Sequence, residues 1–390
     1  MFAKRATILQ ESVTIAITSL ARRLKAEGKD ILSFGAGEPD FDTPEVIKNE
    51  AKKALDAGFT KYTAVEGIPD LLQAIADKLK RENNLNYSPK DIIVSNGAKQ
   101  SLFNLFACVV DEGDEVIVPA PYWVTYPELA RYFGGVAVEI STSEATNFKI
   151  TPEMLQAAIT PKTKMLVLTS PSNPTGSVYT RAELEALAKV LEGTNIIVCA
   201  DEMYEKLLYT GESYTSAASI SDDMFKRTIT INGLSKSVAM TGWRMGYLAS
   251  PNKELINYMI NLQSQSTSNI NSITQKASIV ALRGDADKEI ESMRLAFKER
   301  RDRACELINA IPGLSVLPPD GAFYLFVNIQ EIEQDSMKFC KELLEEKGVA
   351  VVPGAAFGAE GYFRFSFATD MATIEQGISR IADFCAKRRG

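Results

Sequence analysis

The 390-residue chain contains no histidine, and this absence removes several classes of active site. A Ser-His-Asp triad and a Cys-His pair both need an imidazole as the base. Histidine is also a usual ligand of zinc, and the five scattered cysteines form no CxxC pair that could replace it. We therefore expect no metal site. If the chain is an enzyme, Lys, Tyr, Asp, Glu or an organic cofactor must move the protons.

The chain also lacks the features of membrane, secreted and nucleic-acid-binding proteins. No apolar run approaches the ~20 residues that span a bilayer. The first ten residues, MFAKRATILQ, contain no apolar core of a signal peptide. A net charge of −7 opposes binding to nucleic acid or anionic membranes. We therefore predict a cytoplasmic protein with reduced cysteines, which binds neither nucleic acid nor membrane.

The chain does contain a regular alternation of apolar strands and amphipathic helices. Helices are predicted at 43–58 and 180–193, with Thr43 and Thr180 as their N-caps. Most of the predicted strands are continuous apolar runs, as expected where helices cover both faces of a sheet. The alternation predicts an α/β fold with a mostly parallel seven-stranded sheet between helices. Its strands are predicted at 91–95, 115–120, 136–140, 164–170, 195–202, 227–233 and 245–250.

The pattern changes after about residue 285, where one long amphipathic helix is followed by shorter strands and helices. This change predicts a large cofactor-binding domain over 45–285 and a smaller α+β domain over 1–44 and 286–390. The helix near 13–27 and the strand ILSFG are expected to return to the small domain. The sequence shows no internal repeat and no low-complexity tract.

Five polar clusters lie at or just past predicted strand ends, where open α/β sheets bind their ligands. The segment SNGAKQ (95–100) can offer free backbone amides to an anion. The turn SPSNPTG (170–176) aims a side-chain amide. The segment DEMY (201–204) places a carboxylate at the end of a buried strand, where a protonated ring nitrogen could pair with it.

The other two clusters carry cations. Lys236 lies in SKSVAMTGWRMGY (235–247), which also contains Arg244. A neighbouring cation lowers the pKa of a lysine and makes its amine a nucleophile. Arg364 lies in the aromatic strand FRFSFA (363–368), and a buried arginine needs an anion. Its forked donors suit a carboxylate.

Each cluster, taken alone, also has a structural explanation. The alternatives are a capped turn, a plain turn, a capping aspartate, a solvated lysine and a structural ion pair. Taken together, the clusters describe a ligand with an anionic tail, a ring with a basic nitrogen, an electrophile for lysine and a carboxylate. Pyridoxal phosphate with an amino acid has all of these parts.

The sequence resembles the class I aminotransferases of fold type I, and among them the bacterial aspartate aminotransferase branch, over its full length. The resemblance implies a pyridoxal 5'-phosphate enzyme that forms a homodimer with shared active sites. It rests on several motifs in the same order: FGAGEPDF (34–41), KYTAVEG (61–67), SNGAKQ, PYWVTYP (121–127), SPSNPTG, DEMYEKLLY (201–209), the 235–247 run and FRFSFA.

The resemblance also implies roles for individual residues. Lys236 would carry the cofactor as an aldimine and then move the proton at the substrate Cα. Asp201 would keep the ring nitrogen protonated, and Tyr204 would bond the ring oxygen. The implied cofactor contacts are completed by Gly97, Ala98, Ser235 and Arg244 at the phosphate, Trp123 and Asn173 at the ring, and Tyr62 at the neighbouring subunit's phosphate. The implied substrate contacts are Arg364, Gly37, Asn173 and Trp123, with Lys99 at a distal carboxylate.

The implied activity is ping-pong transfer of the amino group from L-aspartate to 2-oxoglutarate, which gives oxaloacetate and L-glutamate. Alternatives are a bifunctional aspartate/prephenate enzyme, an aromatic or alanine aminotransferase, and a C-S β-lyase. A non-enzymatic regulator of similar fold would carry a DNA-binding domain before ILSFGAGEPDF, where this sequence has only about 30 residues.

The chain departs from the family pattern at its missing histidines. The family often has His two residues after the tyrosine of DE-x-Y, and this chain has Lys206 there. We expect little catalytic effect from Lys206, since it follows the residues that contact the cofactor. Any His partner of Asp201 is also missing, so a hydroxyl or a water is expected to replace it.

Overall fold

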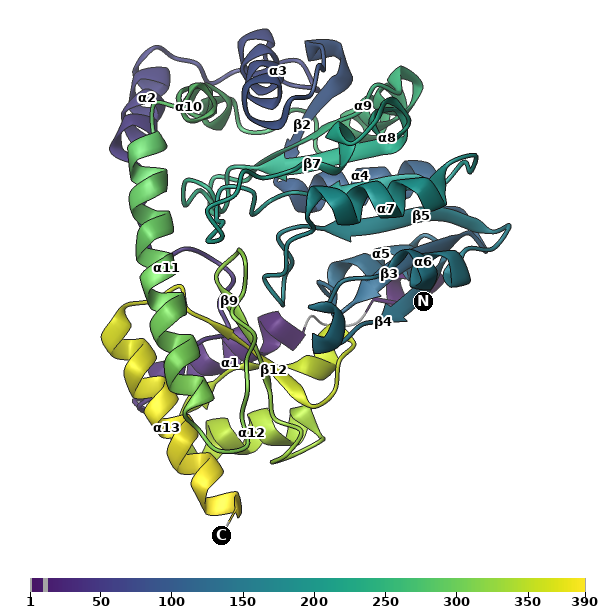
Figure 1. Cartoon of the computed structure of the whole chain (residues 1–390). Helices are drawn as coiled ribbons and strands as arrows, with labels where there is room; N and C mark the ends of the chain where they lie inside the picture. The colour runs from purple at the N-terminus through teal and green to yellow at the C-terminus, as the bar shows by residue number, and fades with distance from the viewer. Residues whose placement is uncertain (1, 10–12, 390) are drawn as a thin grey trace.

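The computed structural model describes residues 2–9 and 13–389, and its largest sheet has seven strands in the order β2-β8-β7-β6-β5-β3-β4 (Figure 1). Only β8 runs antiparallel to its neighbours. The seven predicted strands and the mostly parallel sheet are thus confirmed. The strands are β2 (Ile92–Asn96), β3 (Glu115–Ala120), β4 (Val136–Ser141), β5 (Thr163–Thr169), β6 (Ile197–Asp201), β7 (Thr228–Gly233) and β8 (Met245–Ala249).

Helices cover both faces of this sheet because successive strand residues point to opposite sides. Val116 and Val118 of β3 belong to one apolar cluster, whereas Ile117 between them belongs to another. The first face is covered by α4 (Ala98–Val109), α5 (Thr125–Tyr132) and α9 (Lys253–Ser264), and the second by α6 (Pro152–Ala158), α7 (Arg181–Leu191) and α8 (Asp222–Arg227). A third cluster at the β2 and β8 edge includes α2 (Glu45–Asp56), α3 (Pro69–Asn83) and α10 (Ser272–Arg283).

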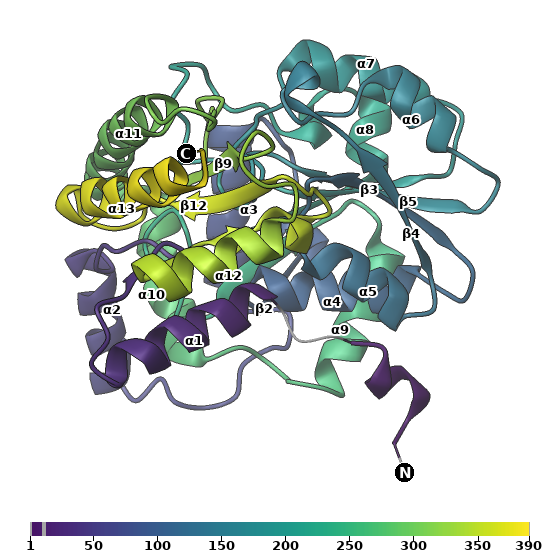
Figure 2. The same ribbon diagram turned by 90° about the horizontal axis from the view of Figure 1, so that it is seen from below.

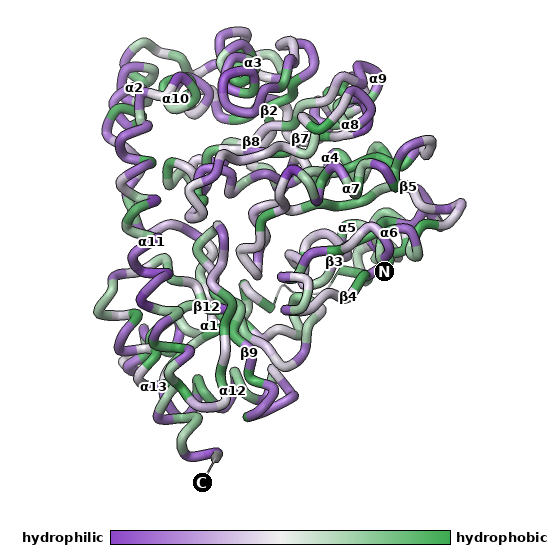
Figure 3. Tube along the Cα trace, viewed as in Figure 1, coloured by the Kyte–Doolittle hydropathy of each residue, from purple (hydrophilic) through white to green (hydrophobic). Residues whose placement is uncertain are grey.

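The remaining elements form a smaller unit below the large sheet in Figure 1. Its antiparallel sheet has the order β11-β12-β9, and β9 and β12 are largely hydrophobic along their length (Figure 3). Helix α1 lies beside α12 (Figure 2). The strands are β9 (Tyr324–Asn328), β11 (Val352–Pro353) and β12 (Tyr362–Ser366), and the helices are α1 (Val13–Ala26), α11 (Asp287–Asn309), α12 (Ser336–Lys347) and α13 (Met371–Arg389).

The N-terminal strand β1 (Leu32–Ser33) pairs in parallel with β10 (Val349–Ala350), as predicted for a segment that returns to the small domain. This pairing supports the predicted division of the chain, while the boundaries at 45 and 285 stay a prediction. Short 3-10 helices lie at Lys4–Thr7, Pro89–Asp91, Glu144–Thr146, Ala217–Ser219 and Gly354–Phe357. In the described part of the chain, no helix is both long and apolar enough to cross a membrane.

One of the two predicted helix caps is wrong. Thr180 caps α7 in a capping box with Glu183, as predicted. Helix α2, in contrast, starts after Pro44 without a side-chain cap. The Thr43 hydroxyl donates to the Ala239 carbonyl at 2.7 Å and accepts from the Trp243 indole at 3.0 Å. Thr43 therefore ties the start of α2 to the loop after β7, and its hydroxyl is directed away from the helix amides.

Candidate active site

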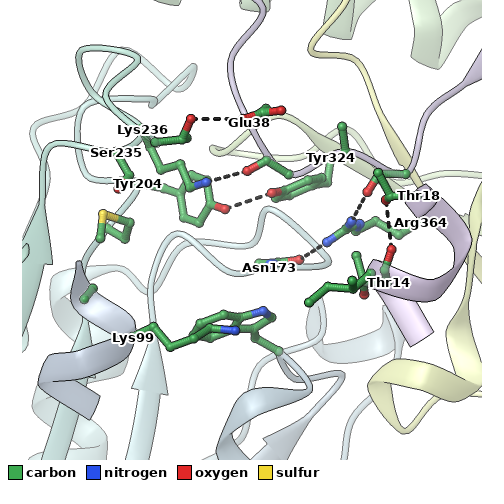
Figure 4. Close-up of a pocket in the computed structure, with 18 of the residues that line it drawn as sticks. Thr14, Thr18, Glu38, Lys99, Asn173, Tyr204, Ser235, Lys236, Tyr324 and Arg364 are labelled. Atoms are coloured by element: carbon green, nitrogen blue, oxygen red, sulfur yellow. Dashed lines mark hydrogen bonds between the residues drawn. The ribbon is translucent and has the colours of Figure 1, made fainter. Parts of the chain in front are cut away.

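A cavity of about 430 Å³ has walls from both the large sheet and the smaller unit. It lies at the carboxyl ends of the parallel strands, where ligands bind in α/β sheets. It brings together most of the predicted site residues, which come from segments far apart in the sequence (Figure 4). The predicted residues that line it are Gly37, Ala98, Lys99, Trp123, Asn173, Asp201, Tyr204, Ser235, Lys236, Arg244 and Arg364.

Asp201 ends the buried strand β6 and is itself buried. Its Oδ2 accepts a 2.7 Å hydrogen bond from the Tyr126 hydroxyl, and its Oδ1 accepts from the Met203 amide at 3.2 Å. Thr169 in turn donates to the Tyr126 oxygen at 2.9 Å. Burial raises the pKa of Asp201, and the two hydrogen bonds act against that rise. Of the two expected partners of Asp201, a hydroxyl or a water, the structure shows a hydroxyl, that of Tyr126.

Lys236 lies in the loop between β7 and β8, and its Nζ donates to the Gly37 carbonyl (Figure 4). Burial lowers the pKa of Lys236 to about 8, helped by the nearby Arg364 and Arg244. Glu38 and Asp201 act in the opposite direction. The predicted lowering of the pKa is confirmed, but its largest cause is burial rather than a neighbouring cation. A substantial fraction of the amine is therefore neutral near pH 8.

Arg364 of β12 is a buried cation, with only 1% of its surface exposed. Its Nη1 donates to the Asn173 Oδ1 and its Nη2 to the Gly35 carbonyl, both at 2.8 Å. The guanidinium also stacks over Tyr324, 4.4 Å from the ring centroid. Its Nε has no hydrogen-bond partner among the described residues, and none of its contacts with them is to a carboxylate. Arg364 therefore does not form the structural ion pair that was the alternative explanation from the sequence. Its positive charge can pair with the anionic group of a ligand.

The start of α4 lines the cavity together with Ser235 and Arg244, and this group of donors could bind an anion. The helix begins after Gly97 without a side-chain cap, so no capping side chain satisfies the amides of its first turn. Gly97 itself is not among the lining residues. A Cβ on Gly97 would collide with the Arg244 guanidinium, and one on Gly246 would collide with the Gly97–Ala98 backbone. These two glycines therefore let Arg244 and the helix start approach each other.

Of two further predicted residues, Lys99 lines the cavity and Tyr62 does not. The Lys99 Nζ lies 4.7 Å from the centroid of the Trp123 ring, and both side chains line the cavity. Partial burial and the nearby Arg244 lower the pKa of Lys99. Tyr62 is 90% exposed and does not line the cavity of its own chain. Its contact with a neighbouring subunit stays a prediction.

Lys206, which stands where the family often has histidine, lies outside the cavity. Its Nζ pairs with Glu82 at 2.7 Å. The adjacent Glu205 forms a buried ion pair with Lys78, and the Asn83 amide donates to Glu205 at 2.6 Å. The substitution therefore belongs to a charge cluster that joins α3 to the segment after β6.

Sequence reasoning missed several residues of the cavity wall. The Tyr324 hydroxyl bonds that of Tyr204 at 2.8 Å, and Tyr324 sits in an apolar strand with no local polar signal. Tyr126 lies in the motif PYWVTYP (121–127), but its hydrogen bond to Asp201 was not predicted from the sequence. One face of α1 also lines the cavity, through Thr14, Ile15, Thr18, Ser19 and Arg22. These residues have the spacing of one helix face, and this spacing can be seen in the sequence of residues 13–26.

Comparisons with known proteins show the family to which this chain belongs. The family described as "Aminotransferase class I and II" matches residues 29–381. An aspartate aminotransferase of Bacillus sp. (strain YM-2) is 48% identical, over 98% of this chain and 99% of its own. An aspartate/prephenate aminotransferase of Nitrosomonas europaea is also 48% identical, over 97% and 98%. The structure of Thermus thermophilus aspartate aminotransferase with maleate has a TM-score of 0.94 at 43% identity, over 98% and 99%.

The chain therefore belongs to the class I and II aminotransferases, enzymes that transfer amino groups and generally depend on pyridoxal phosphate. Its fold is fold type I, and its similar relatives include bacterial aspartate aminotransferases. The family and the fold predicted from the sequence motifs are thus confirmed.

Proposed function

We propose that this enzyme is an aspartate aminotransferase, which transfers the amino group of L-aspartate to 2-oxoglutarate and forms oxaloacetate and L-glutamate. The observation that carries this proposal is the buried Arg364 guanidinium, whose charge no carboxylate of the described residues balances. Besides Lys236 and Arg244, which are assigned to the cofactor, Lys99 also lines the cavity. Arg364 and Lys99 together favour a substrate with two carboxylates.

The donor set of the cavity fits pyridoxal phosphate. The uncapped start of α4, Ser235 and Arg244 would hold the phosphate, since amides, a hydroxyl and a guanidinium gather there. The buried Asp201 would hold a protonated ring nitrogen, which supplies the charge partner that a buried carboxylate needs. Trp123, Tyr204 and Asn173 would complete the ring contacts, and Gly97 makes room for Arg244. When bound, the cofactor supplies an electron-accepting ring.

Each residue of the site would then have its own role in the reaction. Arg364 binds the substrate α-carboxylate, with Gly37 and Asn173 beside it. Asp201 holds the proton on the ring nitrogen, and the Tyr126 bond favours the ionised form of Asp201. Lys236, whose pKa is lowered to about 8, takes up and returns the proton at the substrate Cα. Lys99 binds the distal carboxylate.

The bifunctional alternative also has support, because the Nitrosomonas europaea relative is named an aspartate/prephenate aminotransferase. Prephenate carries two carboxylates, so the same pair of cations would serve it. A C-S β-lyase acting on a monocarboxylate would leave Lys99 without a role. We further propose that the enzyme is a cytoplasmic homodimer in which Tyr62, exposed in one chain, completes the phosphate site of the other.

The test is a substrate panel with the purified enzyme loaded with pyridoxal phosphate. Several amino acids are paired with 2-oxoglutarate, and glutamate is paired with prephenate, with Lys236→Ala as the inactive control. Strong turnover of aspartate alone supports a dedicated aspartate aminotransferase. Comparable turnover of prephenate supports the bifunctional enzyme. Faster turnover of alanine or aromatic amino acids than of aspartate contradicts the proposal.

A further inference from the structure

Tyr324 lines the cavity, and the function proposed above gives it no role. It is the first residue of β9, and the next three residues of that strand are apolar. Its side chain is buried, with only 1% of its surface exposed. A buried tyrosine hydroxyl needs a hydrogen-bond partner. In this chain the partner is another residue of the cavity wall, Tyr204.

The hydroxyls of Tyr204 and Tyr324 lie 2.8 Å apart, and either can be the donor (Figure 4). A hydroxyl has one proton to donate and two lone pairs that accept. If Tyr204 donates to the ring oxygen of the cofactor, as the sequence motifs imply, its proton is used there. The bond between the two tyrosines is then donated by Tyr324. That bond would hold the Tyr204 oxygen and leave the Tyr204 proton directed to the ring.

The ring of Tyr324 also contacts the cation that is proposed to bind the substrate. The guanidinium carbon of Arg364 lies 4.4 Å from the centroid of the Tyr324 ring. Tyr324 is paired with Ser366 across β9 and β12, and Arg364 lies two residues before Ser366 on the same face of the sheet. Burial raises the pKa of Tyr324, and the Arg364 charge acts against that rise. Arg364 therefore makes the Tyr324 hydroxyl a better proton donor.

The Tyr324 hydroxyl also lies close to the segment that holds the Lys236 amine. A Cβ on Gly37 would lie 3.0 Å from this hydroxyl, so glycine leaves room for it. The Gly37 carbonyl accepts a hydrogen bond from the Lys236 Nζ. One tyrosine thus meets the segment that binds the Lys236 amine, the hydroxyl of Tyr204 and the guanidinium of Arg364.

We propose that Tyr324 is a positioning residue, which directs the Tyr204 hydroxyl to the cofactor ring and couples it to the charge at Arg364. This inference rests on the proposed function, in which Arg364 binds the substrate carboxylate. Linked hydrogen bonds polarise one another, so a stronger Tyr324 donor strengthens the bond from Tyr204 to the ring oxygen. A carboxylate bound to Arg364 balances its charge and weakens both bonds.

The test follows the visible absorption of the cofactor-loaded enzyme as the pH is changed. A donor to the ring oxygen stabilises its anionic form and opposes proton uptake by the bound cofactor. In Tyr324→Phe we expect the midpoint of the absorption change to rise by about 0.5–1 pH unit, as for loss of one hydrogen bond. Saturating succinate should raise the midpoint of the unmodified enzyme, and raise that of Tyr324→Phe by less.

A binding measurement separates the hydroxyl of Tyr324 from its ring. The phenylalanine ring stays under Arg364 in Tyr324→Phe. At a pH below both midpoints, the Kd of succinate from isothermal titration calorimetry should therefore be nearly unchanged. In Tyr324→Leu, which removes the ring as well, the Kd should rise about threefold, as for loss of a cation–π contact.

The matched control is Tyr209→Phe. Tyr209 is also buried, and Arg301 lies 4.9 Å from its ring centroid. Its hydroxyl donates to the Ala322 carbonyl, but Tyr209 does not line the cavity, so its variant should keep the midpoint. A double variant tests the route through Tyr204. Tyr204→Phe removes the donor to the ring, so adding Tyr324→Phe should not move the midpoint further.

Three results would overturn the inference: a midpoint that moves no more in Tyr324→Phe than in Tyr209→Phe, a full further shift in the double variant, or a succinate-induced shift of the same size with and without the Tyr324 hydroxyl. Should Tyr324→Phe not fold, Gly37→Ala decides, since its Cβ crowds that hydroxyl. An unmoved midpoint in Gly37→Ala then overturns the inference. The proposed function fails separately if the unmodified enzyme binds the monoacid butyrate as tightly as succinate.

Discussion

The Tyr126 hydroxyl donates a 2.7 Å hydrogen bond to Asp201 at the end of β6. This bond lowers the pKa of a carboxyl that burial alone would raise. Tyr126→Phe should therefore raise the pKa of Asp201 further and weaken its hold on a ring proton. We expect kcat/KM to fall about tenfold, as for loss of one hydrogen bond to a charged group.

The measurement is a pH profile of kcat/KM, whose acid limb should move to higher pH in Tyr126→Phe. Tyr258→Phe is the matched control. It also removes a hydroxyl that bonds a carboxylate, that of Glu254 at 3.0 Å, but neither residue lines the cavity. An unmoved acid limb would show that Tyr126 does not set the ionisation of Asp201.

Lys236 should destabilise the cofactor-free protein at neutral pH. Its folded-state pKa of about 8 lies below the ordinary value of 10.5. Below pH 8 the amine is charged in both states, so the folded protein bears the full cost of burying it. Between about pH 8 and 10.5 the folded state releases the proton first, and the contribution of Lys236 to stability rises with pH.

Lys236→Met should therefore raise the Tm of the cofactor-free protein at pH 7 by a few degrees, on the order expected for about 1–2 kcal/mol. The gain should shrink as the pH is raised from 8 to 10. Differential scanning calorimetry measures both, with Lys189→Met on the exposed face of α7 as the control. A gain that is independent of pH would contradict the burial argument.

Arg364→Lys should mainly weaken the binding of carboxylate substrates. Lysine cannot reproduce the forked donors that reach Asn173 and Gly35. We expect the KM for aspartate to rise about a hundredfold, equivalent to roughly 2–3 kcal/mol of charge-assisted bonding. Arg227→Lys is the comparison, since Arg227 also makes forked contacts, to Asp223, but outside the cavity. That variant should lose stability and keep its KM.

Lys99→Ala should separate dicarboxylic from monocarboxylic substrates. The loss of its amine removes a partner only for a distal carboxylate, so the KM for aspartate should rise about tenfold and the KM for alanine much less. Steady-state kinetics with both donors measures the ratio. Equal increases in the KM for aspartate and for alanine would show that Lys99 does not recognise the distal carboxylate.

The Lys78–Glu205 pair should be a stability element. Both side chains are nearly buried, at 6% and 7% exposure. Lys78→Met leaves the Glu205 charge without its cation and should cost about 3–5 kcal/mol in the free energy of unfolding. Urea unfolding measures this cost. Lys298→Met, which breaks an exposed pair with Asp302, should cost much less.

The sequence allowed the large sheet to be predicted because its strands are marked locally by apolar runs. Asp201, Lys236 and Arg364 were also predictable, since each follows or interrupts such a run with a charge that needs a partner. The roles assigned to these residues stay a prediction.

The rest of the site depends on packing between distant segments. Tyr204 meets Tyr324 across 120 residues, and no local pattern marks that contact. Thr43 was assigned to a cap because helix starts favour threonine, yet Ala239, 196 residues away, accepts its hydrogen bond. Burial likewise dominates the pKa of Lys236, and burial is a property of the assembled cavity.

The Arg364 bond to Gly35 joins residues 329 positions apart, and this has a consequence during protein synthesis. The ribosome makes the chain from its N-terminus, and large domains generally fold as they emerge. The strand ends that carry Asp201 and Lys236 are thus complete long before residue 364 exists. A product cut short between residues 285 and 364 would retain those strand ends but lack Arg364, the residue proposed to bind the substrate carboxylate.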